Sequence, residues 1–265
     1  MIWTLVVKTW RDHWKSTLSW SIGTMAITVV ELMVYPTVKK SAAGTAQLLE
    51  TMPDAFKTIF RMSDYTSGPG FLGAELFSMM MPLIFIAIGA NAGARATAEE
   101  ESSGTADLLL TLPVSRTKII LAKTFAPLVV LLLLAVLLTV TLIIGSGFAG
   151  LVTPTSGVIA ASFQVMLIGA LFTSVALLIG ALFGRKGLAL GVSMALAIAT
   201  FLLYSLAPLT SWLEHWLWLN PFQWAIGNDP LRNGLDVGHT ITNLIVTAVL
   251  ILLSVVAFNR RNITS

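Results

Sequence analysis

Six stretches of about twenty consecutive, mostly apolar residues divide this chain of 265 residues. An α-helix rises about 1.5 Å per residue, so a stretch of this length spans a hydrocarbon core about 30 Å thick. The third stretch is the clearest, because residues 128–136 are only Leu, Val and Ala. The six stretches cover approximately residues 18–35, 71–94, 124–144, 159–183, 188–209 and 241–258. The sequence therefore predicts an all-α polytopic membrane protein with six transmembrane helices.

The composition excludes two other classes of protein. Hydrophobic residues make up 56% of the sequence and charged residues 11%, whereas soluble domains carry about 25% charged residues. These values exclude both a disordered chain and an ordinary cytosolic enzyme. The chain contains no cysteine, which excludes disulfides, thiolate metal sites and thiol nucleophiles. Six spans leave too few residues for a separate catalytic domain, so we expect a single domain, residues 1–265.

The lysines and arginines predict the orientation of the spans, because positive residues are retained on the cytoplasmic side. With the N-terminus inside, the outer segments carry five of the 16, namely Lys39, Lys40, Lys57, Arg61 and Arg232. The other eleven lie on inner segments: Lys8, Arg11, Lys15, Arg95, Arg116, Lys118, Lys123, Arg185, Lys186, Arg260 and Arg261. We therefore expect a multi-pass protein of a prokaryotic plasma membrane with both termini in the cytoplasm. We expect no cleaved signal peptide, because the first apolar stretch starts late and lacks a small-residue cleavage site.

Residues 1–16 are predicted to form an interfacial elbow helix before the first span. Trp3, Trp10 and Trp14 share one face of this helix, and the charged residues share the other. Tryptophan suits the depth of the headgroups, and a cationic face suits anionic cytoplasmic lipid. The alternative is that these residues extend the first span inward.

The loop of residues 95–123, between the second and third spans, combines acidic residues with a proline break. Its first part predicts a short acidic helix that Pro113 ends, because the residue before a proline is disfavoured in the α region. Ser115 then caps a new helix that leads into the third span. The alternative is a solvated acidic turn stabilised by a helix dipole.

This loop resembles the first cytoplasmic loop of the permease subunits of type-2 ATP-binding-cassette (ABC) transporters. The resemblance rests on the order of Glu100, Glu101, Gly104 and Thr105, two leucines, and then Pro113-Val114-Ser115-Arg116 and Lys123. It extends over nearly the whole chain, including Asn220-Pro221-Phe222 before the last span and the closing residues 258–262. That ending is similar to the family's Phe-x-Arg-Arg-Asp, with Asn262 in place of the aspartate.

The resemblance implies a noncatalytic transport subunit whose cytoplasmic loop forms a coupling helix docked on an ATPase subunit. It assigns the coupling role to Glu100, Glu101, Gly104, Thr105, Asp107, Pro113 and Arg116. ATP and Mg²⁺ then belong to the partner, and no cofactor is expected on this chain, which has no G-x-x-x-x-G-K-[ST] motif. The other expected partners are a second permease copy or paralogue and membrane lipid, but no nucleic acid.

The resemblance favours export of an amphipathic or hydrophobic cargo, such as an antibiotic, a peptide or a drug-like compound. A sodium or other ion exporter of the same family is an alternative. A second alternative, from another class, is a membrane signalling or assembly protein that does not transport.

Three polar residues within or beside the predicted spans are candidates for the cargo path: Glu31, Glu75 and Asn91. Carboxylates inside a membrane are costly and often functional. The alternative for the two glutamates is snorkelling. Both lie near the outer ends of their spans, so their carboxylates can reach the membrane surface without a role in transport.

Two outer segments predict interfacial anchors or a gate over the cargo exit. Residues 46–61 predict one or two amphipathic helices broken at Pro53. The second segment predicts an outer aromatic belt of Trp212, Trp216, Trp218, Phe222 and Trp224.

The remaining motifs predict packing rather than chemistry. His13, His215 and His239 have no partner at metal-ligand spacing, and no G-x-S-x-G nucleophile elbow occurs. We therefore expect neither a metal site nor an enzyme. Three G-x-x-x-G spacings predict close helix contacts, at Gly89/Gly93, Gly180/Gly184 and Gly187/Gly191.

Overall fold

The computed structural model describes residues 2–59, 61–102 and 115–261, with side chains except at 2–13, 45–46, 58, 63 and 100–102. Within these ranges the regular structure is helical, without a strand. Six helices are long and apolar enough to cross a membrane. The prediction of an all-α polytopic membrane protein is confirmed.

The predicted spans fall in the long helices of the bundle. The first, third and fourth spans fall in α1 (Ile2–Lys40), α7 (Arg116–Ala149) and α8 (Thr155–Phe183). The fifth covers α9 (Lys186–Leu206) and continues into η3 (Ala207–Leu209), and the sixth falls in α13 (Val237–Arg260). The second is composite: α4 (Gly68–Leu72) leads into a π-helical segment, η2 (Gly73–Met80), and then into α5 (Met81–Ser102). Helices α1, α7 and α13 extend beyond the apolar stretches at both ends.

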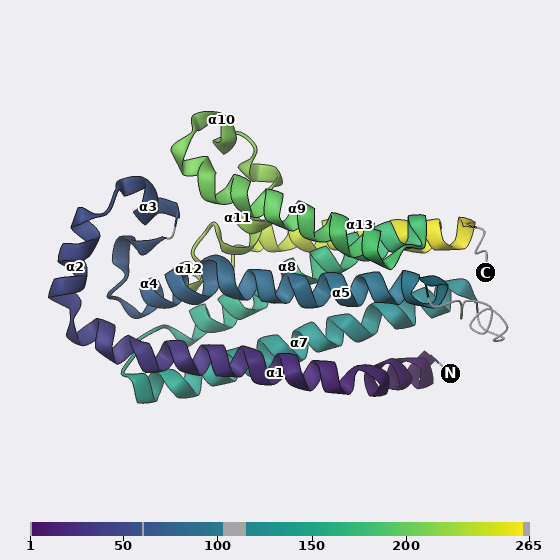
Figure 1. The fold of residues 1–265 in the computed structure, drawn as a ribbon, viewed down its shortest axis with the longest axis horizontal. Coiled ribbons are helices and arrows are strands. Elements are labelled where there is room, and N and C mark those ends of the chain that lie inside the picture. Colours follow the sequence, from purple (N-terminus) through teal and green to yellow (C-terminus); the bar gives the residue numbers. More distant parts are fainter. Residues whose placement is uncertain (1, 60, 103–114, 262–265) are drawn as a thin grey trace.

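Both described ends of the chain lie at the same end of the elongated bundle, which we call the terminal end (Figure 1). The opposite, distal end carries α2 (Ala42–Thr51), α3 (Asp54–Ile59) and η1 (Met62–Asp64). It also carries the short elements between α9 and α13, which are η3 (Ala207–Leu209), α10 (Ser211–Glu214), η4 (Leu217–Leu219), α11 (Pro221–Ile226) and α12 (Pro230–Asn233). Pro53 separates α2 from α3, so the predicted break in this segment is confirmed.

Helix α8 is the central helix of the bundle and packs against α5, α7, α9 and α13. In its most apolar window 78% of the residues are buried, against 17% for α9 and for α13. Its closest partner is α5. A Cβ atom on Gly93 would lie 2.3 Å from the carbonyl oxygen of Thr173, and one on Gly89 would lie 2.5 Å from that of Gly169. The predicted glycine contact at Gly89/Gly93 is thus a close α5–α8 seam.

The other two glycine spacings have different outcomes. Gly180 meets α5, whereas Gly184 ends α8 in the left-handed conformation with φ of +65°. A Cβ on Gly187 or Gly191 of α9 would meet nothing within 4 Å. The prediction of a close contact within this chain is therefore wrong for Gly187/Gly191.

The first apolar stretch ends at Tyr35, but α1 continues through Pro36 to Lys40. A proline removes its own backbone donor, but the following residues can still bond to the preceding turn. Leu32 and Tyr35 are buried in the core and hold this part of α1 against the bundle.

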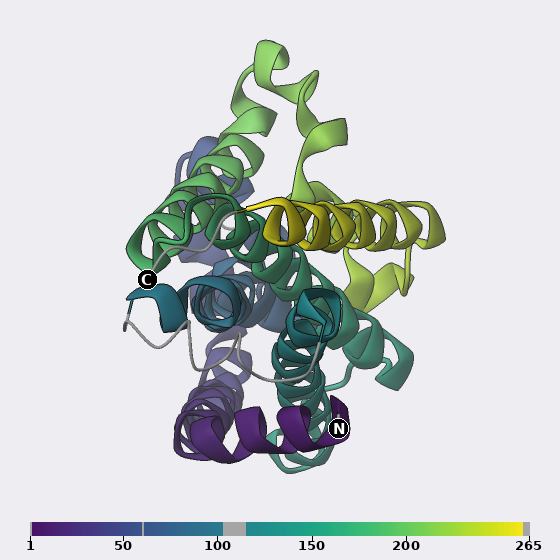
Figure 2. The same ribbon diagram turned by 90° about the vertical axis from the view of Figure 1, so that its right-hand side faces the viewer.

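The predicted elbow, residues 1–16, falls on the first turns of α1, which has no break at this point. Figure 2 shows these turns, at the purple end of the chain, lying across the long axis before α1 turns along it. Trp14 is about half exposed, and the side chains of Trp3 and Trp10 lie outside the description. Their placement in the membrane interface stays a prediction.

The predicted aromatic belt is only partly exposed. Trp212, Trp216 and Trp218 are exposed, whereas Phe222 and Trp224 are buried in the core, so their assignment to a belt is wrong. The reason is a helix cap: the Asn220 side chain accepts a hydrogen bond from Phe222 N and starts α11. Phe222 then packs against Phe201 of α9.

Candidate functional site

The predicted coupling residues lie at the terminal end, between α5 and α7. Helix α5 ends at Ser102, and α7 starts at Arg116 with Ser115 as its N-cap residue, as predicted. The Ser115 hydroxyl makes no capping bond, but its carbonyl accepts from the backbone N–H groups of Lys118 and Ile119. Gly104, Thr105, Asp107 and Pro113 lie outside the described residues, as do the side chains of Glu100 and Glu101. Of the seven predicted positions, Arg116 is the one with a described side chain.

Arg116 is held by the residue that follows α13. Its Nη1 donates to the carbonyl oxygen of Arg261 at 2.9 Å. The Nη1 of Arg261 in turn donates to the carbonyl oxygens of Gly180 and Ala181, at 3.1 Å each. Burial lowers the pKa of the Arg261 guanidinium, because desolvation disfavours its charged form.

Two further contacts join α13 to α7 beside this arginine. The Asn259 Nδ2 donates to Thr117 Oγ1 at 2.9 Å. Phe258 is 5% exposed and packs in a small apolar cluster with Ile120 and Ala181. We call the group of Arg116, Thr117, Asn259 and Arg261 with the carbonyls of Gly180 and Ala181 the terminal clasp. The last residue of the predicted closing motif, Asn262, lies outside the described residues.

Helix α5 reaches the same turn of α8 from the other side. A Cβ on Gly180 would lie 2.1 Å from Thr97 Oγ1, so glycine allows the approach. The Thr97 hydroxyl is also within hydrogen-bonding distance of the Leu177 carbonyl oxygen, at 3.4 Å. Two residues after Thr97 on α5, Glu99 forms an ion pair with Lys186, with 3.0 Å between Oε1 and Nζ. This pair ties α5 to the start of α9. The ends of α5, α7, α8 and α13 thus meet around Gly180.

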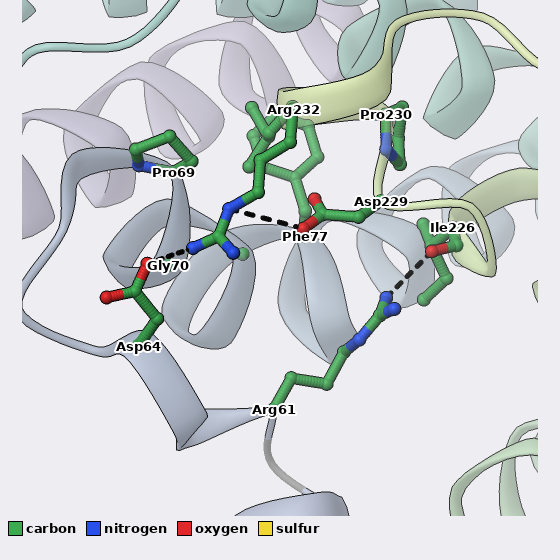
Figure 3. Close-up of a pocket in the computed structure, with 11 residues that line it drawn as sticks. Arg61, Asp64, Pro69, Gly70, Phe77, Ile226, Asp229, Pro230 and Arg232 are labelled. Carbon is green, nitrogen blue, oxygen red and sulfur yellow. Dashed lines mark hydrogen bonds and ion pairs between the residues drawn. The ribbon is translucent and has the colours of Figure 1, made fainter.

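At the distal end, charged residues from two distant segments surround a pocket of about 140 Å³ (Figure 3). Arg232 of α12 forms ion pairs with Asp64 of η1 and with Asp229, the second at 3.5 Å. The Ser67 hydroxyl donates to Asp64 Oδ2 at 2.6 Å. We call Asp64, Ser67, Asp229 and Arg232 the distal clasp. Ligand pockets are usually about 300 to 1,000 Å³, so this pocket is too small for a drug-sized cargo.

The backbone beside the distal clasp is strained at two positions. Arg61 and Asp229 have φ of 54° and 48°, in the left-handed region that residues with a Cβ rarely adopt. Arg61 is fixed there because its Nη1 donates to the Ile226 carbonyl oxygen at 2.7 Å. Strain of this kind persists where surrounding contacts determine the conformation. The segment before α4 is thereby joined to the last residue of α11.

The structure brings two of the three predicted path residues together. Glu31 of α1 and Glu75 of η2 lie within electrostatic reach of each other, and the Tyr65 hydroxyl donates to Glu75 Oε1. Burial and the hydrogen bond to Glu75 raise the pKa of Tyr65. Asn91 lies sixteen residues beyond Glu75 on the same composite helix, roughly 24 Å away at about 1.5 Å per residue. It therefore does not join the two glutamates.

A comparison with known families identifies the family of this chain. The family model described as "ABC-2 family transporter protein" matches residues 3–263, which is nearly the entire chain. The chain belongs to the ABC-2 transporter family. It is therefore a permease, a transmembrane component of an ABC transporter. No curated protein matches the chain.

Sequence reasoning about this ABC-2 permease missed the residues that tie its helices together. Arg261 was predicted as a positive charge after the last span and as part of the closing motif, without a contact, and Arg232 was predicted as a positive charge on an outer segment. The acceptors of Arg261 are backbone carbonyls, which have no sequence signature. The position of Arg261 directly after an apolar helix was the available signal, because basic residues there often bind the carbonyls at a helix end. Among the described residues, no group of three His, Asp or Glu residues is arranged to hold a metal.

Proposed function

We propose that this permease is the membrane subunit of an ATP-driven exporter, and that a separate subunit hydrolyses ATP. The observation that carries the proposal is the convergence at the terminal end. The two helices that flank residues 103–114 both rest on the last turn of α8, the most buried helix of the bundle. A force applied to that segment would therefore reach the centre of the membrane domain.

The coupling role of Glu100, Glu101, Gly104, Thr105, Asp107, Pro113 and Arg116 is part of this proposal. Acidic side chains form strong charge-assisted hydrogen bonds with arginine and lysine of a partner. The sequence has no phosphate-binding P-loop of its own. ATP and Mg²⁺ would therefore bind to the partner, which pushes on the loop when its two copies close.

The terminal end is proposed to face the cytoplasm. It carries eleven of the 16 lysines and arginines, and positive residues are retained on that side. The distal end would then face outward, where the exposed Trp212 and Trp218 suit the membrane interface. Both termini would be cytoplasmic, as would the ATPase subunit.

The proposed cargo is an amphipathic or hydrophobic compound that leaves between two permease subunits, either two copies of this chain or this chain and a paralogue. The pair of Glu31 and Glu75 with Tyr65 supports a second candidate, the export of a cation such as sodium. A carboxylate within a membrane span is costly in free energy, so one that is found there often has a function.

Copurification with the ATPase subunit, followed by two transport assays, tests the proposal. Inverted membrane vesicles would be supplied with ATP and either ethidium, an amphipathic dye, or radiolabelled sodium. We expect ATP-dependent uptake of ethidium, whereas uptake of sodium alone would support the second candidate. Failure of any ATPase to copurify would contradict both.

Substitution of Glu100 and Glu101 by alanine tests the coupling assignment. We expect ATP hydrolysis and transport to lose their coupling. The matched control replaces Glu50 and Glu214, two exposed acidic residues at the distal end, and should behave like the unmodified permease. Unchanged coupling in the Glu100/Glu101 variant would overturn the assignment.

A further inference from the structure

We infer that Arg261 is a positioning residue for coupling: it fixes the first turn of α7 to the last turn of α8. The inference rests on the proposed function and deepens it. It assigns a role to the closing Phe-Asn-Arg-Arg segment, for which the proposed coupling loop provides none.

The argument begins at the C-terminal end of α8. The last four carbonyls of a helix have no partner within the helix. In α8 the carbonyl of Ala181 is one of these, whereas that of Gly180 accepts from the backbone N–H of the C-cap residue Gly184 at 2.9 Å. One guanidinium nitrogen of Arg261 donates to both carbonyls. A cation at this position also interacts favourably with the negative end of the helix dipole. Arg261 therefore caps α8 from a different helix.

The second step extends this cap to α7. Arg116 donates to the backbone carbonyl of Arg261, so its bond depends on where the chain runs after α13. The bond from Asn259 to Thr117 adds a second tie one residue further along α7. Loss of the Arg261 guanidinium would remove the polar tie between the end of α13 and α8 and leave the apolar contact of Phe258 with Ile120 and Ala181. The first turn of α7 would then be held less firmly relative to α8.

The third step concerns the other end of the coupling segment. Helix α5 is fixed to the same turn of α8 through Thr97 and Gly180. The end of α5 and the start of α7 are therefore both fixed to α8, α5 by close packing and α7 by the terminal clasp. Two fixed helix ends transmit an applied displacement to α8, whereas a loose end moves without transmitting it.

An arginine suits this task because its planar fork holds its N–H donors in a fixed geometry, in which Nη1 reaches both carbonyls. The neighbouring Arg260 carries the same charge and is exposed, so it provides a matched control. Arg261→Lys retains the charge and a donor but not the fork.

The experiment uses the permease purified with its ATPase subunit and reconstituted in lipid vesicles. For Arg261→Ala, Arg261→Lys and Arg260→Ala we would measure the yield of the complex and the permease-dependent rate of ATP hydrolysis. We expect Arg261→Ala to form the complex in normal yield and to lose about fivefold or more of the hydrolysis rate, as expected for a lost coupling interaction. Arg261→Lys should recover part of the rate, and Arg260→Ala should leave it unchanged.

A crosslink separates positioning from general stability. The chain has no native cysteine, so Arg261→Cys and Ala181→Cys can be joined by a short thiol-specific linker. The unlinked variant should be as slow as Arg261→Ala, and the linker should restore hydrolysis, because it replaces the lost tie between the end of α13 and the last turn of α8. An Arg261→Ala rate equal to that of Arg260→Ala, or no restoration by the linker, would overturn the inference. If no ATPase copurifies with the unmodified permease, the proposed function itself fails.

Discussion

The two ends of the bundle are held together by different chemistry. At the terminal end, the described contacts of the clasp run from guanidinium and amide groups to backbone carbonyls and a hydroxyl. At the distal end, Arg232 meets two carboxylates, and the side chains of Arg232 and Asp64 are 40% and 47% exposed. The terminal clasp has polar donors on neutral acceptors, whereas the distal clasp is an exposed network of ion pairs.

This difference affects how easily each end opens. Exposed ion pairs contribute about 0 to 1 kcal/mol each and weaken in salt. A guanidinium on the carbonyls at a helix end adds charge-assisted hydrogen bonds there, and these bonds do not depend on a titrating acceptor. In the proposed exporter the distal end would separate to release cargo, while the terminal end would transmit force. The distribution of the two kinds of clasp suits these two tasks.

The largest expected effect on stability comes from disrupting the α5–α8 seam, which supports both ends of the bundle. Gly93→Ala places a Cβ about 2.3 Å from the Thr173 carbonyl oxygen. The α5–α8 seam must then open, and overpacking of this kind costs about 1–3 kcal/mol. We expect a lower midpoint of thermal unfolding in detergent. Gly191→Ala, on the open face of α9, is the matched control and should be neutral or slightly stabilising. Equal midpoints for the two variants would mean that the seam does not support the bundle.

A salt titration sharpens the contrast between the clasps directly. Arg232→Gln removes the ion pairs of the distal clasp and should lower stability by about 1 kcal/mol or less at low salt. The difference from the unmodified permease should shrink in about 1 M salt, where the screening length is about 3 Å.

Arg261→Gln is the counterpart at the terminal end, and its effect on stability should persist in salt. Arg260→Gln controls for the loss of a positive charge. If Arg232→Gln and Arg261→Gln respond to salt in the same way, the two ends do not differ as described.

The smallest expected effect is a pH dependence at the distal end. Asp236 is the N-cap of α13, and its carboxylate accepts from His239 N at 3.0 Å. This bond lowers the pKa of Asp236 below its ordinary value of 3.8. The folded state thus favours the carboxylate, so the stabilisation is present above that value and is lost as the pH falls through the folded pKa.

Unfolding midpoints between about pH 5 and pH 3 test this expectation against Asp236→Asn, which retains a capping side chain but does not titrate. We expect the unmodified permease to lose more stability on acidification than Asp236→Asn. The terminal clasp contributes no such difference, because its described acceptors do not titrate in this range. Parallel pH curves for the two proteins would contradict the expectation.

The sequence predicted the elements that depend on local information. The apolar run of residues 128–136 lies within α7, Ser115 precedes its first residue, and Pro53 separates α2 from α3. Each of these rests on hydropathy, capping preference or backbone geometry within a few residues. The error at Trp224 has the same origin, because the local rule for interfacial tryptophan placed it in an aromatic belt, but packing buried it in the core.

The sequence by itself determined that this is a six-span membrane protein with most of its positive charge at one end, because length, hydropathy and charge act locally. Only the tertiary structure decided which polar groups meet. Arg261 binds a carbonyl 81 residues earlier in the chain, and Arg232 pairs with an aspartate 168 residues earlier. Such contacts depend on how helices cross and rotate, and the glycines of the α5–α8 seam set part of that geometry. One-dimensional patterns do not encode that arrangement, and backbone carbonyl acceptors leave no mark in the sequence.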